Sequence, residues 1–186
     1  FYNIDFYIIM NFKLSINIII YCFIFLSIQT VSGQRFGGNP AGMHWQKLNG
    51  KAVDLLYPKG YESMAGRVKM IADSLSKQST YSLGTAIQKA PIVLQTLPFI
   101  SNAYVGLGPW RSEFYLYPPQ NALELGSTSW LDNLTYHEYR HIHQYSNFRK
   151  GLSKFAYWVA GQQGQTLANA ASVPDWFFEG DAVFHE

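Results

Sequence analysis

One predicted helix places two histidines in the middle of a stripe that should face the protein interior. The helix is expected to begin after Ser129, where Asp132 three residues later completes a capping-box pattern, and to end near Phe148, where Gly151 follows two basic residues. One face of this helix carries, in order, Leu134, His137, His141, Tyr145 and Phe148. Any fold of this chain must therefore accommodate two imidazoles, one turn apart, on the buried side of a helix.

These two histidines belong to the pentapeptide His137-Glu138-Tyr139-Arg140-His141, which has the H-E-x-x-H pattern. Residues four apart lie one above the other on a helix, so both imidazoles can reach one tetrahedral metal ion. Glu138 points to the place where a water on that ion would sit. The alternative is that both histidines are ordinary half-buried side chains and Glu138 is a surface charge, because short patterns also occur by chance.

A catalytic zinc site needs a third protein ligand and keeps one open position for water. His143 does not qualify, because it is two residues from His141 and lies on the far side of the helix. The downstream side chains that could serve are Asp175, Glu179, Asp181, His185 and Glu186. Spacing alone does not choose among them.

The segment from Pro174 to Ala182, P-D-W-F-F-E-G-D-A, resembles the W-x-x-E-G-x-A segment of gluzincin zinc metallopeptidases, including aminopeptidase N-like enzymes and the peptidase MA-like group. In that family the glutamate of this segment is the third zinc ligand. The resemblance therefore implies Zn²⁺ bound by His137, His141 and Glu179, with Glu138 as general base. It extends from Ser129 to Ala182 and implies an α+β fold with a thermolysin-like core, in which a small mixed sheet precedes the active-site helices.

Two departures favour an endopeptidase of the peptidase MA-like branch over an aminopeptidase. Thirty-seven residues, 142 to 178, separate His141 from Glu179, and they include a predicted helix from Leu152 to Val159. The G-x-M-E-N segment with which aminopeptidases bind a free amino terminus is absent, since Gly106-Leu107-Gly108-Pro109-Trp110 does not match it.

The first half of the domain is predicted to be a sheet with one helix. We expect strands at 53–57, 91–96 and 114–117, and a weaker one at 104–107, because these runs are β-branched or aromatic and bounded by Pro or Gly. A helix should carry Met64, Val68, Ile71 and Leu75 on one face. Residues 34–50 are predicted to be loop. In thermolysin-like folds the strand before the active-site helix, here 114–117, binds an extended peptide at the sheet edge.

The N-terminus has the pattern of a signal peptide. Lys13 precedes an apolar run from Ile16 to Ile28, and small residues at 31–33 suggest cleavage before Gln34. The competing interpretation is a membrane anchor, but this run is shorter than the roughly 20 residues that span a bilayer. We expect translation to start at Met10, residues 1–9 to be upstream read-through, and the mature protein to be secreted or to reside in the periplasm or cell envelope without a membrane span.

Composition supports a single mature domain, residues 34–186. An apolar share of 48% is enough for a core, and a formal charge of +2 with 14% charged residues does not suggest a nucleic-acid partner. The sequence ends inside a predicted helix without a Gly or Pro stop signal, so we expect this zinc metallopeptidase domain to be incomplete at its C-terminus and a further domain to follow in the parent protein.

The functional prediction is a secreted zinc-dependent metallopeptidase acting on a peptide or protein substrate. The alternative is a non-catalytic zinc-binding or binding module of a larger secreted or envelope protein. A deformylase-like hydrolase of other amides would need a cysteine ligand, and Cys22 leaves with the signal peptide. Asp181 is either a partner of a ligand histidine or a solvated carboxylate. Nearby candidates for an oxyanion donor are His143, Tyr145 and Tyr139.

Overall fold

The computed structural model describes residues 39–78, 83–119 and 129–185, all of which belong to one compact unit, 39–186. The predicted signal peptide, Met10 and Cys22 lie outside the described residues, as does Glu186. In chain order the elements are β1 (Trp45–Asn49), β2 (Val53–Pro58), α2 (Glu62–Gln78), β3 (Ala90–Gln95), β4 (Ser101–Leu107), β5 (Trp110–Leu116), α3 (Trp130–Asn147), α4 (Gly151–Ser172) and α5 (Asp175–Phe184). The described domain is therefore mixed α+β, with strands preceding most of the helices, as predicted.

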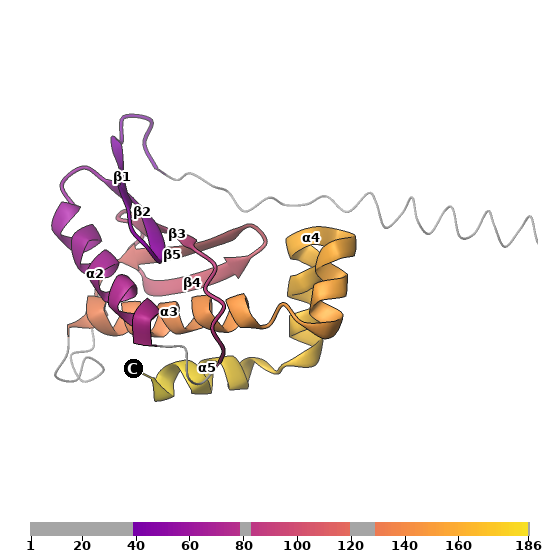
Figure 1. The fold of residues 1–186 in the computed structure, drawn as a ribbon. Coiled ribbons are helices and arrows are strands. Elements are labelled where there is room, and N and C mark those ends of the chain that lie inside the picture. Colours follow the sequence, from indigo (N-terminus) through magenta and orange to yellow (C-terminus); the bar gives the residue numbers. More distant parts are fainter. Residues whose placement is uncertain (1–38, 79–82, 120–128, 186) are drawn as a thin grey trace, which may run out of the picture. The chain divides into compact units, whose positions relative to one another are not determined.

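The five strands form one mixed sheet in the order β1-β2-β3-β5-β4. β2, β3 and β5 run parallel, while β1 and β4 pair antiparallel with their neighbours at the two ends (Figure 1). β4 is thus an edge strand, and β5 lies between β3 and β4. The prediction that the strand at 114–117 offers a sheet edge is wrong, because β5 is paired on both sides.

One face of the sheet packs against α2 and α3 and forms the core. The core side chains come from alternate strand positions and from one stripe of each helix: Val53, Leu55, Ile92, Leu94, Phe114, Val68, Ala72, Tyr139 and Ile142. In α2 the buried stripe is Ala65, Val68, Ile71 and Ala72. Met64, predicted to be on this stripe, is 39% exposed, because the core side of the helix is centred one residue further along.

Three strand predictions are confirmed within a few residues at their ends, and the weak candidate at 104–107 is the second half of β4. β1 contradicts the prediction of a loop over 34–50. Its sequence, Trp-Gln-Lys-Leu-Asn, has little apolar alternation, and exposed and half-buried positions alternate along it. Pairing with β2 over all five residues makes this segment a strand.

α4 extends well beyond the predicted helix 152–159 and consists of two helical segments. The backbone leaves the helical region at Ala160 and at Gly161, whose φ is +61°. After this kink the second segment lies beside the first, as the two orange coils labelled α4 show (Figure 1). α5 then runs back along α3 and carries the C-terminal part of the predicted site.

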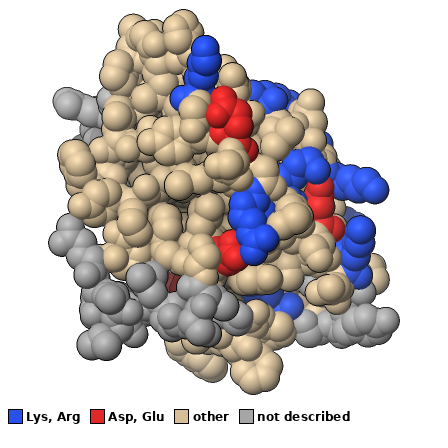
Figure 2. Space-filling model, turned by 90° about the vertical axis from the view of Figure 1, so that its left-hand side faces the viewer, with Lys and Arg blue, Asp and Glu red and all other residues tan. Residues whose placement is uncertain are grey.

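Basic and acidic side chains adjoin one another on the face of the molecule shown in Figure 2. Among the described residues, Lys69 pairs with Asp73, Arg67 with Asp132, and Lys47 and Lys89 with Asp54. Within the described ranges, no helix combines the length and the apolar character that crossing a bilayer requires.

Candidate metal centre

α3 begins after Ser129, as predicted, but without the capping-box hydrogen bonds. The Ser129 carbonyl accepts from the backbone N–H groups of Asp132 and Asn133, and its side chain makes no capping bond. The Asp132 carboxylate instead accepts two hydrogen bonds from Arg67 of α2. This pair attaches the first turn of α3 to α2, and the pentapeptide His137 to His141 follows in the second and third turns.

The structure brings His137, His141 and Glu179 together. Their facing atoms are separated by 3.1 Å (Nε2 of His137 to Nε2 of His141), 3.3 Å (His137 Nε2 to Glu179 Oε2) and 3.6 Å (His141 Nε2 to Glu179 Oε1). Ligands bound tetrahedrally at about 2.0–2.1 Å lie roughly 3.3 Å apart, so these atoms already fit a small divalent cation. Among the described residues this is the only group of three His, Cys, Asp or Glu side chains close enough to hold a metal ion.

Glu179 reaches the site because α5 packs against α3. Phe178, the residue before it, is buried, and its ring contacts the rings of Tyr145 and Phe148 on α3. Ala182, one turn later, is also fully buried. Burying Phe178 and Ala182 on one side of α5 directs Glu179 toward the histidines. Its carboxylate remains 62% exposed.

The hydrogen bonds of Gln144 determine the tautomer of His141. Nε2 of Gln144 lies 2.9 Å from the Phe178 carbonyl and 2.7 Å from the Asp181 carboxylate, two groups that only accept. The other amide atom must therefore be the oxygen, and it accepts from Nδ1–H of His141 at 2.8 Å. Nε2 of His141 then carries the lone pair, which is the arrangement a metal ligand requires.

Asp181 acts on the ligand histidine through Gln144 and is also paired with Arg140. Nε and Nη2 of Arg140 each donate to the Asp181 carboxylate at 2.7 Å. Burial raises the pKa of Asp181, but the hydrogen bonds from Arg140 and Gln144 outweigh burial and lower the pKa below its ordinary value. Asp181 is therefore an ionised partner of the site rather than a solvated carboxylate.

Glu138 is buried beside the three facing ligand atoms. Only 4% of the residue is exposed, and its Oε2 has no hydrogen-bond partner among the described residues. Burial, with a smaller contribution from the negative charge of Glu179, raises the pKa of Glu138 to about 8. A carboxyl with such a pKa can take up and release a proton near neutral pH.

A cavity of about 260 Å³ adjoins these groups. It is lined by four residues of β4 and five from the helices: Asn102, Ala103, Tyr104, Val105, His137, Glu138, His141, Tyr145 and Glu179. The metal centre thus opens beside the edge strand of the sheet. Tyr145 is the one local oxyanion candidate that lines this cavity, and its ring stacks on His141 at a centroid distance of 6.3 Å.

The remaining candidates from the sequence lie elsewhere. His143 is buried on the far side of α3, as predicted, where its Nε2–H donates to the Gly84 carbonyl at 2.9 Å. Tyr139 belongs to the hydrophobic core.

Two of the alternative third ligands do not join the cluster. His185 contacts the backbone and the carboxylate of Asp181, and Asp175 is the first residue of α5. Arg111 on β5 pairs with Glu113, as Arg140 pairs with Asp181.

Gln144 is the functional residue that the sequence analysis missed. It lies three residues after His141, a spacing that permits contact on a helix, but glutamine has no distinctive signal and its role depends on α5.

The chain was compared with models of protein families, with curated proteins and with solved structures, and none of them matches it.

Proposed function

We propose that this protein is a zinc-dependent peptidase of the gluzincin type, with a thermolysin-like core, that acts outside the cytoplasm. The observation that carries the proposal is the buried carboxylate of Glu138 beside three converging ligand atoms. A purely structural metal site has no use for a proton acceptor with a pKa of about 8 at its open side. The signal-peptide pattern before Gln34 supports secretion or an envelope location.

Two imidazole nitrogens and one carboxylate are a donor set that suits zinc and is typical of its catalytic sites. His137, His141 and Glu179 would hold the ion, and one coordination position would remain open toward the cavity. When bound, zinc supplies Lewis acidity and makes a water molecule more acidic. Gln144 supports this role because it keeps Nε2 of His141 available for the metal.

Glu138 has the position and the pKa of a general base. It accepts a proton from the attacking water and passes it to the nitrogen of the leaving amine. Its burial raises its pKa and so makes the carboxylate a stronger base than an exposed one. Tyr145 lines the same cavity and can approach a substrate carbonyl from the α3 side.

The substrate class follows from the edge strand. β4 is paired with β5 on one side only among the described residues, and its residues 102–105 line the cavity. On this strand the N–H of Ala103 donates to the Asn102 side chain at 2.9 Å. An extended peptide can add to this edge and bring a peptide bond to the metal centre. This supports an endopeptidase, with β4 in the role first assigned to the strand at 114–117.

The test measures metal content first and peptide hydrolysis second. We expect elemental analysis of the full chain to give about one zinc per molecule, and His141→Ala and Glu179→Ala to lose it. Glu138→Gln should retain zinc but lose hydrolysis of a quenched fluorescent peptide library by a factor on the order of 10² or more. Asp175→Asn, an exposed change on the same helix as Glu179, is the matched control and should retain both zinc and activity.

Two results would contradict the proposal. A folded wild type that takes up no zinc would refute the metal centre. If both the wild type and Glu138→Gln bind zinc but neither hydrolyses any peptide, the result would instead point to a non-catalytic zinc-binding module.

A further inference from the structure

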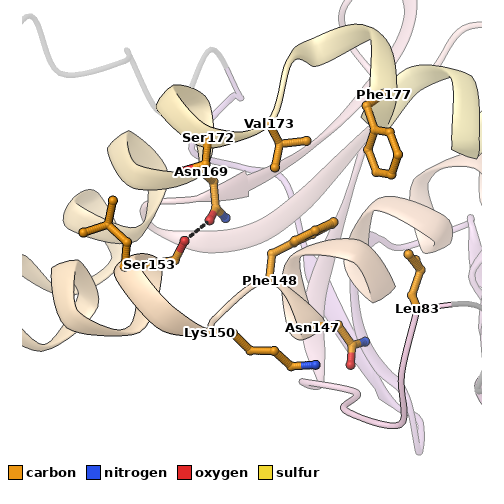
Figure 3. Close-up of a pocket in the computed structure, with 10 residues that line it drawn as sticks. Leu83, Asn147, Phe148, Lys150, Ser153, Asn169, Ser172, Val173 and Phe177 are labelled. Atoms are coloured by element: carbon orange, nitrogen blue, oxygen red, sulfur yellow. Dashed lines mark hydrogen bonds between the residues drawn. The ribbon is translucent and has the colours of Figure 1, made fainter.

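A second cavity lies at the far end of α3, where α3, both segments of α4 and α5 meet (Figure 3). Its volume is about 470 Å³, which is within the range of small-molecule pockets. The apolar part of its wall consists of Leu83, Phe148, Leu152, Val173 and Phe177. None of these side chains belongs to the metal centre described above. The cavity therefore has space and apolar surface for a small organic molecule.

One buried polar group in this wall lacks a partner. Asn169 is 4% exposed, and its Oδ1 accepts from Ser153 Oγ at 2.6 Å, which joins the two segments of α4. Its Nδ2 has no hydrogen-bond partner among the described residues. Figure 3 shows this nitrogen on the side of the amide that faces Phe148 and Val173. A buried N–H donor without a partner favours a ligand that brings an acceptor.

The electrostatics of the cavity favour an anionic acceptor. Lys150 lines it and is the N-cap residue of α4, and no side chain caps that helix. The first N–H groups of a helix have no partner within it and carry partial positive charge. No acidic residue lines the cavity, and none occurs between Glu138 and Asp175 in the sequence. The Asn169 amide and the Lys150 side chain thus line one apolar cavity next to the start of α4, with the Lys150 side chain extended toward Asn147 (Figure 3).

We propose that this cavity binds an aliphatic carboxylate. The carboxylate group accepts from Nδ2 of Asn169, the positive charges of Lys150 and of the start of α4 attract it, and the hydrocarbon chain packs against Phe148, Val173 and Phe177. A single ammonium matches a single negative charge, and the mainly apolar wall favours a hydrocarbon body over a phosphate or a sugar. This inference does not depend on zinc or on peptidase activity.

Calorimetric titration of the full chain with octanoate tests the proposal. The titration is done in excess chelator, so that no metal at His137 and His141 can hold the carboxylate. We expect saturable binding of one octanoate per chain and at least tenfold weaker binding of octanamide, which has the same chain without the charge. Lys150→Gln should weaken octanoate binding about fivefold. Lys154→Gln, an exposed change one turn further along α4, should leave it unchanged.

Asn169→Leu, which removes the donor, should weaken octanoate more than octanamide. Because Lys150 is exposed, the Lys150→Gln result stands even where Asn169→Leu does not fold. Absence of saturable binding, equal affinity for octanoate and octanamide, or equal effects of Lys150→Gln and Lys154→Gln would each overturn the proposal.

Discussion

The side-chain oxygen of Gln144 accepts a hydrogen bond from Nδ1–H of His141 at 2.8 Å, and the amide nitrogen of the same residue donates to Asp181 at 2.7 Å. This polar connection joins α3 to α5 in addition to the Arg140–Asp181 pair and the apolar contact between the two helices. This connection holds the imidazole of His141 in a single tautomer and a single orientation. A residue outside the H-E-x-x-H pattern therefore orients one of the proposed metal ligands.

Replacing Gln144 by Met should weaken zinc binding by about tenfold or more, because partners that orient a ligand histidine typically contribute that much to affinity. Competition with a chromogenic chelator measures the change. Gln78→Met, at the exposed end of α2, has the same chemistry and should bind zinc as the wild type does. Equal zinc affinity in both variants, with circular dichroism unchanged, would show that Gln144 does not position His141.

Asp181→Asn should destabilise the fold even without metal. Arg140 is 5% exposed and would lose the carboxylate that accepts two of its hydrogen bonds. Breaking a buried pair on one side costs about 3 kcal/mol, since the remaining charge is left buried. Urea denaturation in excess chelator measures this loss. Asp175→Asn, exposed on the same helix, should change the free energy of unfolding by less than about 0.5 kcal/mol, and a similar loss in both variants would contradict the assignment.

The residues that form the metal cluster were predictable because most of the information is local. His137 and His141 are four apart on one helix, so their proximity follows from helical geometry alone. Glu179 came from a resemblance in a nine-residue segment, and the structure brings it within 3.6 Å of both histidines. The strands rich in β-branched and aromatic residues were predictable for the same reason, because the residue types that favour a strand lie within the strand itself.

The features that sequence missed depend on contacts between distant segments. β1 is a strand because β2 pairs with it, and β4 rather than β5 is the edge because of the order in which the strands assemble. The second segment of α4 contains Gly, Gln and Ala with little apolar periodicity, and a glycine at a kink resembles a helix end. Its helical structure depends on packing against the first segment.

Gly164 lies against Ala156 of the first segment of α4, so it provides a test of the packing between the two segments. A Cβ there would lie only 2.1 Å from the Ala156 carbonyl oxygen, so Gly164→Ala must push the segments apart. We expect a loss of about 1–3 kcal/mol in the free energy of unfolding. Gly66→Ala is the control, because a Cβ at Gly66 in α2 meets nothing within 4 Å, and better helix propensity should stabilise the fold by about 0.5–1 kcal/mol. Stabilisation in both variants would contradict the close packing.

The buried pair of Arg111 and Glu113 on β5 predicts how stability depends on pH. Nε of Arg111 lies 2.6 Å from the Glu113 carboxylate, which also accepts from Tyr104 at 2.6 Å. Burial raises the pKa of Glu113, but hydrogen bonds from Tyr104, Arg111 and Gln95 outweigh burial and lower the pKa below 4.5. The folded state therefore binds this proton less tightly than the unfolded chain does. The stabilisation is complete above about pH 4.5 and is lost as pH falls through the lowered pKa.

Glu113→Gln should thus cost about 3 kcal/mol at pH 7, where it leaves Arg111 buried without its counter-charge, and progressively less as the pH falls below 4.5 and through the lowered pKa of Glu113. Urea denaturation at a series of pH values gives both free energies. Asp132→Asn removes the carboxylate from the more exposed pair with Arg67 and should cost less than about 1 kcal/mol at pH 7. A Glu113→Gln penalty that stays constant from pH 7 to pH 3 would mean that the hydrogen bonds of Glu113, and not its charge, stabilise this part of the sheet.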